Sequence, residues 1–158
     1  MKIIKRMIII IVCIPIALIL LVTAFEIAGM IVNHTATWRQ TEKLKNVIEK
    51  ELTDAEIIDT YSETGNTSGT GNHVDMLSVV VFRTNESISD IEIKLKDYYE
   101  FDEWGCWVEK LDTMAEIHEP GSFWYQIWDE MDISEDSDNC YLMYLNQSAP
   151  FADNIEGH

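Results

Sequence analysis

Basic side chains are scarce in this chain, which has 11 lysines and arginines against 28 aspartates and glutamates, a formal net charge of −17. A nucleic-acid-binding protein needs a basic face that displaces counterions from phosphates, so the composition argues against that class. Intrinsic disorder is excluded too, because 47% hydrophobic and 10% aromatic residues supply enough side chains for a core. A length of 158 residues then suits one folded domain.

Local motifs of common enzymes are also missing. The sequence contains neither His-Glu-X-X-His nor Gly-X-Ser-X-Gly, and the glycine-rich stretch 65–72 lacks the Lys-Ser/Thr pair of a phosphate-binding loop. We therefore expect no cofactor and lean away from an enzyme. A hydrolase that combines His73 or His118 with nearby carboxylates remains the alternative.

What the chain does have is one long apolar run. The 19 residues 7–25 carry no charge, and as a helix at about 1.5 Å per residue they would extend roughly 28 Å, close to the thickness of a bilayer core. Apolar and small residues resume after Glu26 and continue to Val32. The sequence therefore predicts a transmembrane signal-anchor over 7–32, with membrane lipid as its partner, and a signal peptide cleaved after Ala24 is the alternative.

The charges around this run predict its orientation. Three basic residues lie within the first six positions, beside the free amino group, and long domains are translocated largely regardless of their own charge. We expect residues 1–6 to form a cytoplasmic tail and residues 33–158 to lie outside the cell membrane, which makes the chain a single-pass protein. The exported part carries 8 basic and 27 acidic residues, a net charge of −19.

Patterning of the exported part predicts an α+β fold with a small, mostly antiparallel sheet and one or two helices. A helix is expected over 37–52, with Thr37 and Gln40 as a capping box, either starting there or continuing from the membrane span as a stalk over 33–53. A domain over 54–146 and a C-terminal tail over 147–158 follow. The remaining expected elements are a helix at 87–100 and strands at 55–61, 74–84, 104–111, 123–130 and 140–146.

Only two cysteines lie outside the apolar run, Cys106 and Cys140, and both fall in expected strands. In an oxidising compartment they could form a disulfide, and two buried free thiols are the alternative.

The acidic stretch 129–138 invites a calcium site, with Asp132, Asp136 and Asp138 as candidate ligands. Their alternate spacing resembles the start of an EF-hand loop, yet Ser137 takes the glycine position and Met143 the place of the bidentate glutamate. A solvated loop is therefore the default, with loose cation binding as the alternative.

Aromatic residues concentrate between positions 104 and 128. Trp104, Trp107, Trp124 and Trp128 could stack on sugars or on an extended peptide if they were exposed, although core packing is the simpler expectation.

These observations predict a membrane-anchored protein that displays a small acidic domain as a non-enzymatic interaction or accessory module. Its partner would be an envelope protein or a ligand that the sequence does not identify. A membrane-tethered hydrolase and a carbohydrate- or peptidoglycan-binding module that uses exposed tryptophans are the alternatives.

Overall fold

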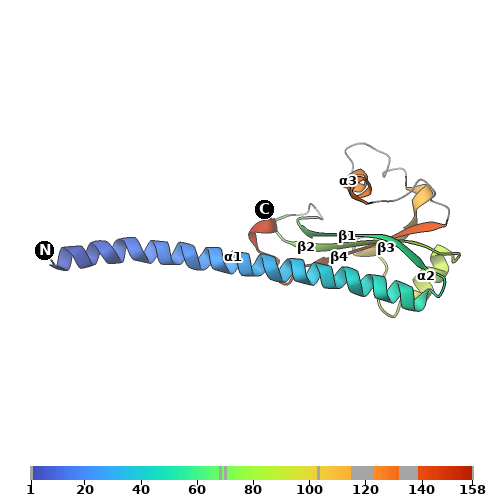
Figure 1. The fold of residues 1–158 in the computed structure, drawn as a ribbon, viewed down its shortest axis with the longest axis horizontal. Helices are drawn as coiled ribbons and strands as arrows, with labels where there is room; N and C mark the ends of the chain where they lie inside the picture. Colours follow the sequence, from blue (N-terminus) through green and yellow to red (C-terminus); the bar gives the residue numbers. More distant parts are fainter. Residues whose placement is uncertain are drawn as a thin grey trace.

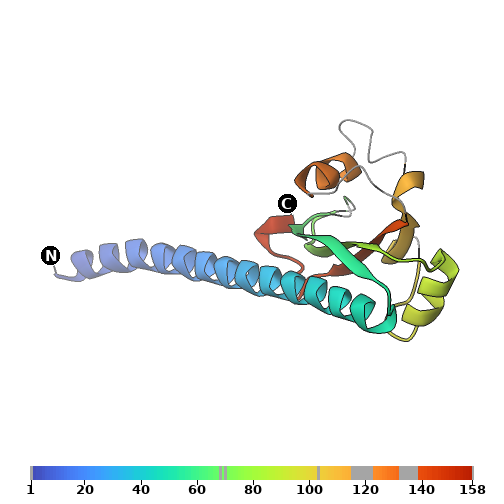
Figure 2. The ribbon, with the colours of Figure 1, turned by 45° about the vertical axis from the view of Figure 1, so that its right-hand side comes forward.

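The computed structural model describes residues 2–67, 69, 71–102, 104–114, 123–131 and 139–157. A single helix, α1 (Lys2–Glu51), runs through the first third of the chain and lies along a four-stranded sheet with its second half (Figure 1). At 1.5 Å per residue its 50 residues extend about 75 Å. Figure 2 shows its first half projecting from the domain, while the C-terminus lies beside the middle of the helix.

The two halves of α1 have different surroundings. Large apolar side chains from Ile10 to Phe25 are exposed, whereas Leu44 and Ile48 are completely buried against the sheet. The first half is long and apolar enough to cross a membrane. Of the two alternatives for the start of the second helix, the structure has the one in which the helix continues directly from the apolar run.

No helix begins at Thr37, so the predicted capping box is wrong. Thr37 lies inside α1, where its hydroxyl donates to the carbonyl of Asn33 at 3.0 Å and contacts the hydroxyl of Thr64 at 2.7 Å. Gln40 instead reaches across to the sheet. A capping pattern signals a helix start only where the preceding residues leave the helix, and here they do not.

The sheet contains β1 (Glu56–Gly65), β2 (Asp75–Arg83), β3 (Cys106–Lys110) and β4 (Cys140–Ser148). Its order is β1-β2-β4-β3, and every neighbouring pair is antiparallel. This confirms the α+β class and four of the five expected strands. The central strand β2 is apolar and buried on both faces, because both faces of the sheet are covered.

Alternate residues of the central strands enter two separate clusters. One face carries Val80, Phe82 and Met143 against α1 and against α2 (Ile88–Leu95). The other carries Val79, Val81 and Leu142 against η1 (Leu111–Thr113) and α3 (Phe123–Glu130). The domain therefore has three layers, with the sheet in the middle (Figures 1 and 2).

Helix α2 lies within the region where the sequence favoured a helix over a strand. The Ser87 hydroxyl accepts from the backbone N–H of Asp90, which makes Ser87 the N-cap of this helix. Ile91 and Leu95, four residues apart, are its buried face.

The strand expected over 123–130 is wrong, because this segment forms α3. Ile127 and Met131, one helical turn apart, are buried against the sheet, with 2% and 7% of their surfaces exposed. Aromatic residues favour strands, and over eight residues a period of 2 is hard to distinguish from a period of 3.6. The segment packs on the face of a sheet whose strands already pair with one another, and it therefore forms a helix rather than a further strand.

A C-terminal tail was expected over 147–158, but residues 147–157 belong to the folded domain. Strand β4 continues to Ser148, Ala149 and Asn154 are buried, and η3 (Ile155–Gly157) closes the described chain. We call residues 149–157 the C-terminal segment.

Candidate functional site

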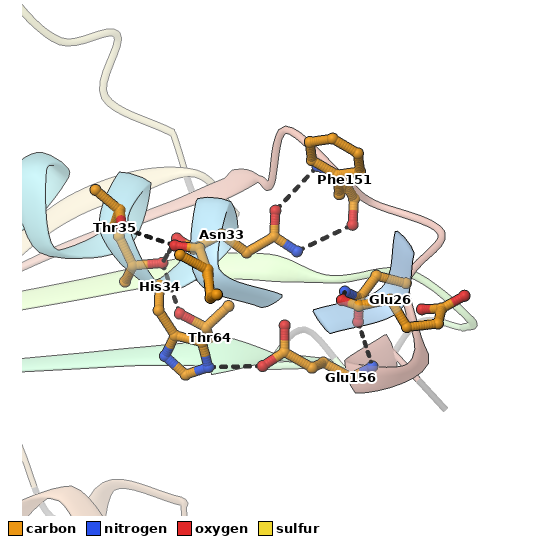
Figure 3. A network of polar contacts seen from close by, with 10 residues as sticks. Glu26, Asn33, His34, Thr35, Thr64, Phe151 and Glu156 are labelled. Carbon is orange, nitrogen blue, oxygen red and sulfur yellow. Dashed lines mark hydrogen bonds and ion pairs between the residues drawn. The ribbon is translucent and has the colours of Figure 1, made fainter. Parts of the chain in front are cut away.

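The C-terminal segment folds back onto α1 where the exposed apolar half of the helix ends. Glu26, Gly29 and Asn33 are spaced i, i+3 and i+7 and thus share one helix face. We call the contact between this face of α1 and the C-terminal segment the junction (Figure 3).

Asn33 is the central residue of the junction. Its side chain is completely buried, its Nδ2 donates to the carbonyl of Phe151, and its Oδ1 accepts from the Phe151 backbone N–H, both at 3.0 Å (Figure 3). One asparagine thereby satisfies both backbone groups of a residue that belongs to no strand.

Glu26 holds the next turn of the segment. Its Oε2 accepts from the backbone N–H of Ile155 at 3.0 Å, and its main-chain carbonyl accepts from Asn154 Nδ2 at 3.1 Å. Between Glu26 and Asn33, Gly29 allows close approach, because a Cβ there would lie 2.7 Å from Asn154 Nδ2.

A histidine and an aromatic pair complete the junction. His34 Nε2 lies 2.6 Å from Glu156 Oε1, and the rings of Phe25 and Phe151 meet edge to face with centroids 5.7 Å apart. The junction therefore combines apolar and hydrogen-bonded contacts within ten residues of α1.

The face of α1 that points away from the junction remains apolar and open. Ile27 and Ile31 are 51% and 63% exposed at the same level as the buried Asn33. This part of the helix presents one side to the domain and an apolar side to the surroundings.

The structure does not bring the two predicted disulfide partners together. Both thiols are free and buried, Cys106 in the cluster against α1 and Cys140 in the cluster on the other face of the sheet. Cys106 is paired with Leu145, five residues along β4 from Cys140, which is too far for a bridge without backbone movement. The alternative of two buried thiols describes the structure, and burial raises the pKa of the Cys106 thiol to about 12.

The tryptophans have different environments. Trp104 is 81% exposed in the turn before β3, while Trp107 is half-buried and stacks on Tyr144 with ring centroids 5.2 Å apart. Trp128 packs partly buried against the same cluster as Trp107. Trp124 belongs to α3, and its side chain lies outside the described part.

The remaining candidates were the metal ligands and the histidines. Asp132, Asp136, Asp138 and His118 lie outside the described residues. His73 is paired with Asp75, with Nε2 and Oδ1 2.8 Å apart. Among the described residues, no group of three or more His, Cys, Asp or Glu side chains could hold a metal ion.

Sequence reasoning missed the junction. Glu26 and Asn33 interrupt an apolar helix on the face that also carries Gly29, and such an interruption is the signal that could have indicated a partner for that face. The sequence did not identify the partner of this face, because the C-terminal segment that covers it lies at the other end of the chain.

Comparisons with known proteins give no relative: no family model, no curated protein and no solved structure matches this chain.

Proposed function

We propose that the chain is a single-pass membrane protein, anchored by the first half of α1, whose N-terminus is cytoplasmic and whose acidic α+β domain lies outside as an interaction or accessory module. The supporting observation is the continuity of α1. The same helix exposes apolar side chains from Ile10 to Phe25 and then enters the core of the domain at Leu44.

The exposed half of α1 has the surface that lipid would cover. Leu18, Leu21 and Phe25 are 56%, 67% and 60% exposed, whereas large apolar side chains of a folded domain in water are mostly inside. Burial in hydrocarbon would remove this apolar area from water at roughly 25 cal/mol per Å².

The junction supports rigid display of the domain. A helix without a break, held a second time by the C-terminal segment at Glu26 and Asn33, leaves no flexible linker between span and domain. The domain would therefore keep a fixed height and tilt above the bilayer. Its net charge of −19 favours partners with a basic surface.

Site-directed labelling in intact cells tests the anchoring and the orientation. Glu100→Cys places a thiol at an exposed position of the domain, and Lys5→Cys places one before the span. A membrane-impermeant maleimide should label the first variant in intact cells and the second only after permeabilisation. Labelling of Lys5→Cys in intact cells, or protection of Glu100→Cys, would contradict the orientation.

The mass of the mature protein separates an anchor from a cleaved signal peptide. Because every junction residue follows Ala24, cleavage after Ala24 would leave the domain complete, so folding alone does not discriminate between the two. A membrane-bound chain that retains residues 1–24 is expected, and a mature protein that begins at Phe25 would overturn the anchor.

A further inference from the structure

A second feature lies one to three helical turns beyond the junction, between α1 and the sheet. A cleft of about 260 Å³ is lined on α1 by Ala36, Arg39, Gln40 and Lys43. The facing wall consists of Met76, Leu145 and Gln147 on the same sheet face, with Tyr98 and Tyr99 of the segment after α2.

The cleft exists because the apolar core stops short of it. From Leu44 onward α1 packs large apolar side chains on the sheet, but at Gln40 and Thr41 the contact is polar and meets Ser78 of β2. On the facing sheet, the pairing of β3 with β4 stops at Leu145, and β4 continues beyond it to Ser148. Helix, sheet and the Tyr98–Tyr99 segment thus surround a space that no large side chain of the described residues fills.

Two side chains of the wall each carry a buried polar atom that has no hydrogen-bond partner among the described residues. Gln40 Nε2 donates to the carbonyls of Met76 and Leu145, which fixes the amide and leaves Oε1 without a donor. The hydroxyl of Tyr99 is likewise unpartnered. Gln40 and Tyr99 are 9% and 8% exposed, and unsatisfied polar groups this buried are rare in native proteins.

Two unpaired cations lie at the mouth of the same cleft. Arg39 and Lys43 are exposed on neighbouring turns of α1, and neither forms an ion pair or hydrogen bond within the part of the chain that the structure describes. In a chain with 28 acidic residues, two cations on neighbouring turns that form no ion pair among the described residues are available to an anionic ligand.

We propose that this cleft binds a small organic carboxylate of about the size of an amino acid, held by Arg39 and Lys43. The guanidinium of Arg39 suits a carboxylate because its planar fork matches the two oxygens. An N–H or O–H of the ligand would donate to Gln40 Oε1, and the hydroxyl of Tyr99 would donate to the ligand.

Volume and lining favour this class over a larger or purely inorganic ligand. Sites for drug-sized molecules usually have volumes of roughly 300–1,000 Å³, so a cleft of about 260 Å³ fits a smaller ligand. Ala36, Met76 and Leu145 add apolar contact that a phosphate ion would not use. Burial also raises the pKa of Tyr99 to about 12, so its hydroxyl stays protonated and able to donate at neutral pH.

Thermal unfolding of the full-length protein in detergent micelles gives the primary test. The probes are the twenty standard L-amino acids, the amide of any that binds, and inorganic phosphate, all at equal ionic strength. At least one amino acid should raise the midpoint and bind in calorimetry, while its amide and phosphate should not. The proposal is overturned if no amino acid stabilises the protein beyond sodium chloride, or if phosphate stabilises it equally.

Matched variants locate the binding. Arg39→Gln should weaken affinity at least about tenfold, because it removes a charge-assisted contact. Lys45→Gln, the same charge change on α1 outside the cleft, should leave affinity within about twofold. Equal losses in the two variants would indicate a general charge effect and refute the site.

Tyr99→Phe supplies an independent test, because it should change the stability of the free protein and the ligand-induced shift in opposite directions. Removal of an unpartnered buried hydroxyl should raise the unfolding midpoint of the free protein, whereas the shift produced by the ligand should become smaller. An unchanged ligand shift would remove Tyr99 from the site, and an unchanged shift in both Tyr99→Phe and Arg39→Gln would overturn the proposal.

Discussion

Asn33 and Phe151 are 118 residues apart in the sequence and are joined by two hydrogen bonds, one in each direction between the Asn33 amide and the Phe151 backbone. This pair ties the end of the chain to the helix at the level where its apolar exposed half stops. The contact gives the domain two attachments to α1, the sheet and the C-terminal segment. Both would have to be disrupted before the domain could tilt freely on the helix.

Asn33→Ala should destabilise the junction by about 2 kcal/mol, because two hydrogen bonds are lost and the backbone groups of Phe151 remain partly buried without partners. Chemical denaturation of the full-length protein in micelles measures the change. Thr35→Ala is the matched control, since within the described chain its exposed hydroxyl bonds to the carbonyl of Ile31 in the same helix and to no other residue. Equal stabilities of the two variants would show that the junction contributes nothing.

Gly157→Ala should release the end of the C-terminal segment. A Cβ at Gly157 would lie 2.7–2.9 Å from backbone atoms of His73, which cannot move aside as a flexible side chain could. A clash of this kind costs roughly 1–3 kcal/mol, unless the last residues detach. Faster amide exchange at Val74, which donates to the carbonyl of Ala152, reports the release.

Gly65→Ala is the control for this substitution. The nearest atom to a Cβ there is the carbonyl oxygen of Glu156 at 3.8 Å, an ordinary contact distance. Exchange at Val74 should therefore remain as in the wild type. A response of equal size in both variants would contradict the steric explanation.

Reducing agents should leave the unfolding midpoint unchanged, because Cys106 and Cys140 lie on opposite faces of the sheet. The raised pKa of Cys106 also keeps its buried thiol protonated and unreactive at neutral pH. Both cysteines should react with a thiol reagent only after unfolding. A loss of stability on reduction would show a bridge that this fold does not allow.

Acid should weaken the turn held by Asp54. The hydroxyl of Thr84, the backbone N–H of Asn85 and the Asn85 side-chain amide donate to this carboxylate and lower its pKa from 3.8 to about 2. Because the folded-state pKa is lowered, the stabilisation is present above pH 3.8 and is lost as the pH falls from 3.8 toward 2.

Asp54→Asn isolates this contribution. The variant should be less stable than the wild type at neutral pH, and the difference should shrink as the pH falls through this range. Acid unfolding of the two proteins, followed by circular dichroism, gives the comparison. Curves that stay parallel down to pH 2 would assign the acid sensitivity to other carboxylates.

Local pattern was sufficient for much of the fold. The uncharged run at 7–25, the two-sided apolar strand around Val80 and the Ser87 cap each depend on neighbours within a few residues, so the helix, the central strand and α2 were predictable. The helix over 123–130 was not predictable, because eight residues rich in aromatics fit a strand period of 2 and a helix period of 3.6 equally well. Packing against the sheet selects the helix.

Composition and periodicity were enough to predict an apolar helix long enough to cross a bilayer, an acidic domain after it and a mostly antiparallel sheet. These properties follow from composition and from periods of two and 3.6 residues. The contact of Asn33 with Phe151, the separation of Cys106 and Cys140 by the sheet, and the cleft shared by Arg39 and Tyr99 became visible only in the folded structure. Each of these relationships joins residues far apart in the chain, whose proximity depends on how the helix crosses the sheet and where the strands end.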